Sequence, residues 1–121
     1  MKVEDVIAEH PEEITELFYK LRALILSLDE RIDEDVYGGK VVKMVSFSVS
    51  RTDNVMAVLS PSENHCKLFL HYPDDIDAMG LKLEGKGKHA RHIKIKPSDP
   101  WEEDKIQYAL TQVLAIVLTK V

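Results

Sequence analysis

The apolar side chains in the first third of the chain recur with a helical period. A short apolar piece ends near His10, and Pro11 suits the first turn of a new helix. The two glutamates that follow Pro11 lie at the positive end of this helix. We expect this second helix to end by Asp33, ahead of the Gly38-Gly39 pair. Its apolar residues are spaced at i, i+3, i+4 and i+7, which predicts one buried stripe: Ile14, Leu17, Phe18, Leu21, Leu24, Ile25 and Leu28.

The middle of the chain changes to an alternation of apolar and polar residues, which is typical of strands. The segments between these alternating runs are short, so we expect consecutive strands to pair antiparallel. In the last of them Ile93 and Ile95 face one way, and His92, Lys94 and Lys96 face the other. The predicted strands cover residues 41–49, 55–59, 67–72 and 92–96, with turns at 51–54 and 61–64 and a short helix or turn at 74–79.

The C-terminal segment returns to a helical period over residues 100–120. Asp99 suits the N-cap, Pro100 the first helical position and Glu102 the third, a variant of the capping box. Both long helices need an apolar surface, and one face of the sheet supplies it. The predicted fold class is therefore α+β: an antiparallel sheet of about four strands with the N- and C-terminal helices packed on one face.

Length and composition limit the possible functions. We expect one domain over the 121 residues, and no apolar run is long enough to span a membrane. The N-terminus does not have the composition of a signal peptide, and a single cysteine cannot form an internal disulfide, so we expect a cytoplasmic protein. The net charge of −5 argues against nucleic acid as a partner.

Positive charge is nevertheless concentrated in residues 80–97, which contain six Lys or Arg residues and one acid, a net charge of +5. The stretch Gly85-Lys-Gly-Lys88 matches neither a P-loop nor a dinucleotide-binding fingerprint. Glycines can still bring backbone N–H groups close to an anion, and arginine offers a two-pronged donor. The alternative is a solvated turn beside a strand edge protected by lysines. The candidate ligand-binding residues are Tyr37, His71, Gly85, Lys86, Gly87, Lys88, Arg91 and His92.

The histidines and the cysteine do not have the spacing of a metal site. His65, His71, His89 and His92 include no pair spaced as zinc ligands are, so ordinary surface or strand histidines are the simpler interpretation. Cys66 is more typical of a small buried apolar residue than of a nucleophile. The sequence therefore gives no positive evidence for an enzyme, and we predict no cofactor, with iron as the alternative.

Acidic residues crowd the expected end of the second helix. Asp29, Glu30, Asp33 and Glu34 lie there, where negative charge opposes the helix dipole. Carboxylates are hard ligands that suit iron, so these four residues are the candidate ligands of an iron alternative. Charge runs are also common on solvated helix faces, which is the competing interpretation.

Three stretches of the sequence resemble a known family. The chain is similar to the uncharacterised YdhG-like bacterial domains in the succession Arg51-Thr-Asp-Asn-Val55, Cys66-Lys-Leu-Phe-Leu-His71 and Leu83-Glu-Gly-Lys-Gly-Lys88 with Arg91-His-Ile93. The similarity covers about residues 14–118, but Val36-Tyr-Gly-Gly-Lys-Val41 replaces the Trp-Gly-x-Pro-x-Tyr-like stretch of that family. The resemblance implies an α+β fold somewhat like frataxin and iron chaperoning in at least one relative, and it implies no established catalysis.

Three functions follow as hypotheses. The first is a module that binds a small anionic molecule at the loop of residues 85–92. The second is a frataxin-like iron-binding chaperone that uses the acidic helix faces. The third is a protein-interaction module that acts through its sheet face or as a homodimer.

Overall fold

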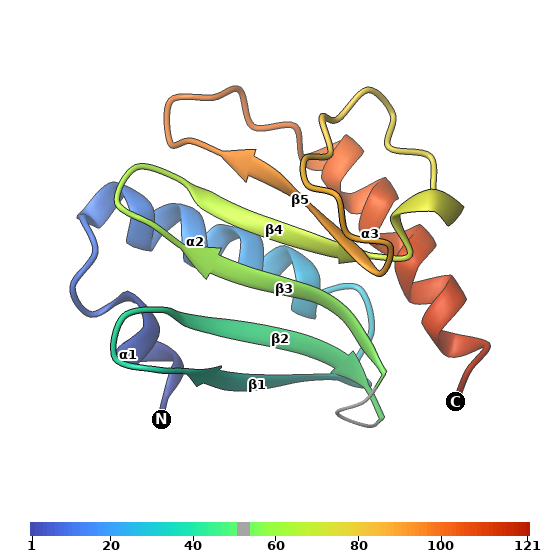
Figure 1. The fold of residues 1–121 in the computed structure, drawn as a ribbon, viewed down its shortest axis with the longest axis horizontal. Helices are drawn as coiled ribbons and strands as arrows, with labels where there is room; N and C mark the ends of the chain where they lie inside the picture. Colours follow the sequence, from blue (N-terminus) through green and yellow to red (C-terminus); the bar gives the residue numbers. More distant parts are fainter. Residues whose placement is uncertain (51–53) are drawn as a thin grey trace.

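The protein consists of one layer of helices on one layer of sheet (Figure 1). The structure is a computed structural model that describes residues 1–50 and 54–121. The helices are α1 (Val3–Ile7), α2 (Glu12–Leu26) and α3 (Glu103–Leu118), with a 3-10 turn η1 (Pro73–Asp75). The strands are β1 (Ile32–Gly38), β2 (Lys43–Val49), β3 (Val55–Pro61), β4 (Cys66–His71) and β5 (Ala90–Ile95).

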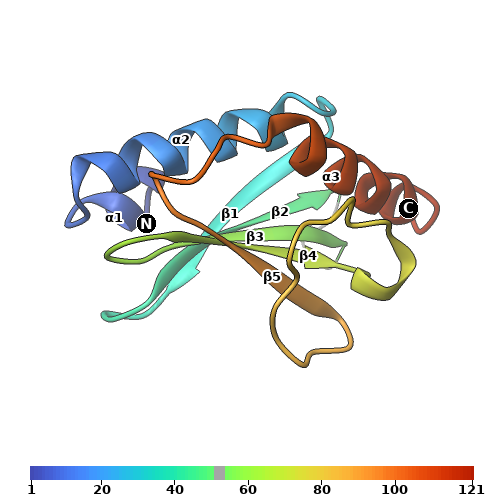
Figure 2. The same ribbon diagram turned by 90° about the horizontal axis from the view of Figure 1, so that it is seen from above.

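The five strands form one antiparallel sheet in the order β1-β2-β3-β4-β5. All three helices lie on the same side of this sheet (Figure 2). The predicted α+β class is confirmed, with one strand more than the four expected. We call the side under the helices the covered face and the opposite side the open face.

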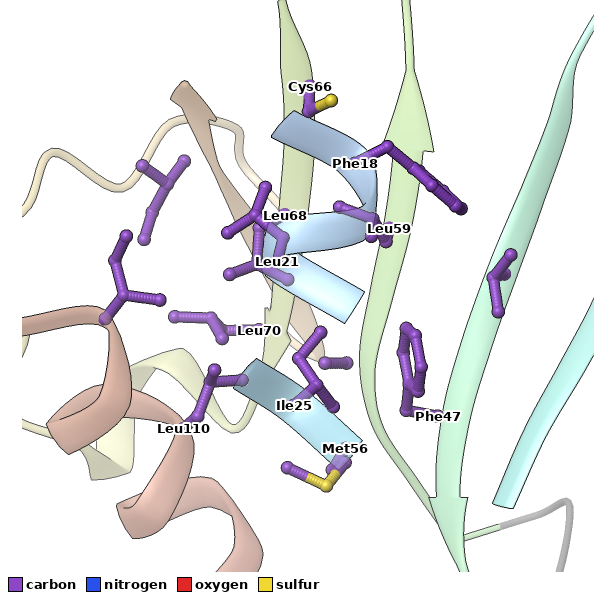
Figure 3. Close-up of a cluster of buried hydrophobic side chains, with 14 of the residues drawn as sticks. Phe18, Leu21, Ile25, Phe47, Met56, Leu59, Cys66, Leu68, Leu70 and Leu110 are labelled. Atoms are coloured by element: carbon purple, nitrogen blue, oxygen red, sulfur yellow. The ribbon is translucent and has the colours of Figure 1, made fainter. Parts of the chain in front are cut away.

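Apolar residues from both layers meet on the covered face. Leu21 and Ile25 of α2 and Leu110 of α3 are completely buried against Leu59, Leu68 and Leu70 of the sheet (Figure 3). Strand β4 shows the reason most simply, because Cys66, Leu68 and Leu70 are buried and the residues between them are half-exposed. The alternation seen in the sequence therefore assigns each side chain to a face.

The main correction concerns the region after the second helix. We expected the helix to end by about Asp33 and the first strand to begin at residue 41, but α2 ends at Leu26 and β1 already begins at Ile32. The Asp29 carboxylate accepts hydrogen bonds from the Arg31 backbone N–H and side chain, which stabilises the turn between them. Several of the acids therefore belong to an edge strand and not to a helix terminus.

The start of the last helix also differs from the prediction. Helix α3 begins at Glu103 with Glu102 as its N-cap, so the capping box at Asp99 was wrong. The Asp99 carboxylate accepts a hydrogen bond from the Lys96 N–H at 2.9 Å, and the Asp99 N–H donates to the Lys96 carbonyl at 3.0 Å. Asp99 thus closes a turn at the end of β5. The expected turn over residues 51–54 lies outside the described residues except for Asn54.

Candidate functional site

The glycine-containing loop after residue 83 folds back along β5. Glu84 and His92 form an isolated antiparallel bridge, in which the Glu84 N–H donates to the His92 carbonyl at 2.7 Å and the reverse bond is 3.0 Å long. The Tyr72 N–H donates to the His89 carbonyl at 3.2 Å, which ties the far end of the loop to β4. The outer edge of β5 is therefore partly paired by its own preceding segment.

Two glycines permit this tight return. Gly85 has a φ of +105°, and a Cβ added to it would lie 3.7 Å from the His92 ring. A Cβ on Gly87 would lie 2.5 Å from the Ala90 carbonyl oxygen, too close for any real side chain. These contacts show that the glycines shape the hairpin. The predicted role of the same glycines in holding an anion stays a prediction.

Arg91 is already engaged within the protein. Its Nε donates to the Gly87 carbonyl at 3.2 Å, and its Nη1 lies 3.3 Å from the Asp74 carboxylate. It pairs across the ladder with Leu70, so it lies on the covered face. Arg91 therefore holds the loop and the η1 turn together, and it does not share a face with His92.

His92 lies on the open face beside an aromatic neighbour. It pairs with Phe69 of β4, and the two ring centroids are 5.0 Å apart with a tilt of 48°. Partial burial lowers the pKa of His92, and the nearby Lys67 ammonium group adds to this, while Glu84 acts in the opposite direction. The Phe69 ring is half-buried although no described helix covers this face.

Two lysines lie directly opposite each other next to this pair. Lys67 of β4 faces Lys94 of β5 in the antiparallel register. His65 lies close by, and burial, followed by the charges of Lys67, Lys94 and Lys96, lowers its pKa. We call the set His65, Lys67, His92 and Lys94 the basic corner of the open face.

His65 has an incomplete set of hydrogen bonds. Its Nδ1 lies 2.6 Å from the Asn64 side-chain oxygen. Its Nε2 is shielded from solvent and has no partner among residues 1–50 and 54–121. A buried polar atom without a partner costs about 1–3 kcal/mol, so this nitrogen lowers the local stability next to β4.

The remaining predicted ligand residues divide into two groups. His71 lies on the open face of β4 and is near His89, and burial followed by the His89 charge lowers its pKa. Lys86 and Lys88 are exposed on the loop. Tyr37 lies on β1, at the opposite edge of the sheet, so four strand spacings of about 4.8 Å separate it from β5. The structure thus brings His71, the loop and His92 together, but not Tyr37.

The acidic candidates do not converge. Asp29 is paired with Arg31, whose hydrogen bonds lower the pKa of Asp29 to about 2. Glu34 lies on the covered face and receives two hydrogen bonds from Arg22 of α2. Asp33 is exposed on β1 and Glu30 in the turn before it. In the described part of the chain, no three His, Cys, Asp or Glu side chains are grouped so as to hold a metal ion.

Cys66 is a structural residue. It is completely buried, and this burial raises the pKa of its thiol to about 12. The thiolate that nucleophilic chemistry needs is therefore strongly disfavoured. The interpretation of Cys66 as a small apolar residue is confirmed.

Sequence reasoning missed Lys67, Lys94, Phe69 and His65 as members of one site. The sequence showed part of this arrangement, because alternate residues of a strand point to the same face: 65, 67, 69 and 71 in one segment, and 92, 94 and 96 in the other. The register that places Lys67 against Lys94 was not readable, since it depends on the irregular segment between the two strands.

Comparisons with models of known protein families, with curated proteins and with solved structures give no match. The resemblance to YdhG-like domains therefore stays a prediction. None of the helices in the described residues is both long and apolar enough to cross a membrane.

Proposed function

We propose that this chain is a small binding module for an anionic molecule, and that the anion is held at the basic corner of the open face. Lys67 and Lys94 supply the charge, and the loop of residues 85–88 borders the site beyond His92. This proposal keeps the ligand class inferred from the sequence and moves the site from Arg91 towards the two lysines.

The observation that carries the proposal is the direct pairing of Lys67 with Lys94. Like charges opposite each other on neighbouring strands destabilise a sheet by roughly 0.2–1 kcal/mol. An anion between the two ammonium groups would turn this repulsion into two attractions.

The aromatic pair beside the lysines narrows the kind of ligand. Phe69 and His92 present a half-buried ring surface next to the charges. A planar apolar group attached to a phosphate or carboxylate would contact this surface while its anion lies between the lysines. Glu84 lies opposite His92 at the outer edge, and its carboxylate would repel a negatively charged group of the ligand on that side.

Family and location belong to the same proposal. The L-x-G-x-G-K segment with Arg91-His-Ile93 supports a YdhG-like bacterial domain, and the observed α+β fold agrees with that assignment. The single free cysteine supports a cytoplasmic location. We do not extend the proposal to iron, because Asp29 and Glu34 are already paired with arginines.

The test is a titration with inorganic phosphate and with adenosine monophosphate, followed by NMR at low salt. Chemical-shift changes should cluster at residues 65–69 and 84–94. Lys67→Gln or Lys94→Gln should each weaken binding by about threefold to tenfold, which corresponds to the loss of one partly screened charge.

Lys105→Gln is the matched control, because it removes one positive charge from α3 on the other side of the protein. It should leave the affinity unchanged. The proposal is contradicted if Lys105→Gln weakens binding as much as Lys94→Gln, or if the shifts spread evenly over all lysines.

A further inference from the structure

The two edges of the sheet end differently. Along the outer edge of β5, Glu84 and His92 exchange two backbone hydrogen bonds, and the Asp99 carboxylate accepts a hydrogen bond from the Lys96 N–H just beyond the strand. The chain thus pairs much of this edge itself. At the opposite edge β1 pairs with β2 over all seven of its residues without an irregularity, and in the described part of the chain no strand lies beyond it (Figure 1).

The hydrogen-bond pattern shows which backbone groups of β1 point outward. The Gly39 N–H donates to the Val42 carbonyl at 2.9 Å, so the odd-numbered residues of β1 are those that bond to β2. Bonded and non-bonded pairs alternate along an antiparallel ladder, so Glu34 and Val36 direct their N–H and C=O groups away from β2. Among residues 1–50 and 54–121 the structure shows no hydrogen bond to these outward groups.

Strand β1 lacks most of the features that keep an edge strand from pairing. Natural sheets protect their edges with short strands, prolines, lysines or bulges, but β1 is regular, and the register shift of this sheet lies between β2 and β3. Its protection consists of acids, of which Asp33 and Asp35 are exposed on the open face. Like charges on neighbouring strands destabilise a sheet and opposite charges stabilise it, so this edge disfavours an acidic strand and favours a basic one.

The covered side of the same edge offers an apolar surface. Arg22 of α2 donates two hydrogen bonds to Glu34, which brings this part of the helix next to β1. Tyr19 precedes Arg22 by three residues and therefore lies on the same side of the helix. Tyr19 and Val36 are both apolar residues packed against the core, and neither is completely buried. Apolar side chains of an added strand would complete their burial.

We propose that β1 is the docking edge for an extended basic segment of another protein, which adds an antiparallel strand to the sheet. Its N–H and C=O groups pair with those of Glu34 and Val36, as in other cases where a peptide extends a sheet. Its lysine or arginine side chains lie on the open face, opposite Asp33 and Asp35. The residues between them point to the covered face and are apolar. The partner segment therefore alternates basic and apolar residues.

This docking edge is separate from the proposed anion site. Strands β2 and β3 lie between β1 and Lys67 of β4, and Lys94 is one strand further away. No residue of β1 belongs to the basic corner. Binding of phosphate and binding of a peptide can therefore be measured on the same variants, and either can fail while the other is retained.

The probe is the peptide Thr-Val-Lys-Val-Lys-Val-Thr with blocked ends, which is as long as β1 and is titrated into the whole chain at low salt. Added salt should weaken its binding. Asp33→Asn and Asp35→Asn should each weaken binding by about twofold to fivefold, because each removes one pair of opposite charges across the strands. Asp104→Asn is the matched control, because it removes an exposed acid from α3, and it should leave the affinity unchanged.

Amide hydrogen exchange, measured by NMR, is the most specific readout. In the free protein the amides of Glu34 and Val36 should exchange faster than that of Asp35, which faces β2. The peptide should slow exchange at Glu34 and Val36 by about tenfold or more and leave Asp35 little changed. N-methylation of the peptide's valines, whose N–H groups would face β1, should abolish binding. N-methylation of its lysines, whose N–H groups would face solvent, should not.

Val36→Pro tests the same edge from the side of the protein. The N–H that it removes points outward, and edge strands accept proline at such positions. This variant should keep its circular dichroism and its phosphate binding but lose the peptide. The proposal is overturned if the unmodified peptide does not bind, if the peptide with methylated valines binds equally well, or if exchange at Glu34 and Val36 is not slowed. It is also overturned if Asp104→Asn weakens binding as much as Asp35→Asn, since the attraction would then be non-specific.

Discussion

The covered and open faces of the sheet are formed by the same five strands but differ in the side chains they carry and in how deeply these are buried. On the covered face most positions are apolar and buried, with Glu34 and Arg91 as charged exceptions on the two edge strands, and the helices add two matching stripes. On the open face serines occupy the centre, acids lie on β1, and lysines lie on β4 and β5 with Glu84 beside them at the outer edge. The covered face accounts for the fold, whereas the directly opposed lysines on the open face lower stability, which is why we assign function to that face.

Substitutions of two adjacent residues on β4 should give the largest difference in the free energy of unfolding. Leu70→Ala removes a completely buried side chain from the covered face and should lower the free energy of unfolding by about 2–5 kcal/mol. Phe69→Ala, one residue earlier on the open face, should lower it by only about 1 kcal/mol, since the ring is half-exposed. Urea denaturation measures both. Equal losses would mean that the open face is part of the core.

The hairpin at the border of the basic corner gives the next largest effect. Gly87→Ala would place a Cβ 2.5 Å from the Ala90 carbonyl oxygen and should destabilise the protein by about 1–3 kcal/mol. Gly39→Ala is the control, because nothing lies within 4 Å of its added Cβ. Thermal melts of the two variants should therefore differ clearly. If Gly87→Ala melts like Gly39→Ala, the hairpin is not built as described.

The open face should also make stability depend on pH. Burial lowers the pKa of His65, His71 and His92 below the ordinary value of about 6.5. The unfolded chain therefore binds more protons than the folded one just below pH 6.5, so the free energy of unfolding should fall as the pH drops from about 7 to about 5. Denaturation at both pH values measures this, and His71→Gln should reduce the dependence. Stability that is flat or rises on acidification would contradict the three lowered pKa values.

Much of the fold was predictable because burial on the covered face requires apolar residues at regular intervals in the sequence. The stripe of α2 and the alternation of β2, β4 and β5 were both readable for this reason. Strand β1 was missed because it is an edge strand in which only Ile32 and Val36 are apolar on the covered side, and three acids mask the alternation. The start of α3 was misplaced because Asp99 bonds back to Lys96 instead of forward into the helix.

The site was less predictable than the fold. Composition located the positive charge near β5, and parity placed His92 and Lys94 on one face and Arg91 on the other, as the structure confirms. Composition could not show that Asp74 and Gly87 already engage Arg91, or that Lys67 faces Lys94. Both facts depend on contacts between residues distant in the sequence, which no local pattern encodes.

The most direct test of the central claim is the free energy of unfolding of Lys94→Gln with and without phosphate, at a protein concentration where the chain is monomeric. Without phosphate the variant should be more stable than the unmodified protein by about 0.2–1 kcal/mol, because the repulsion with Lys67 is gone. At matched ionic strength, phosphate should stabilise the unmodified protein more than the variant and so reduce or reverse this difference. A variant that is no more stable without phosphate, and that responds to phosphate as the unmodified protein does, would contradict the account.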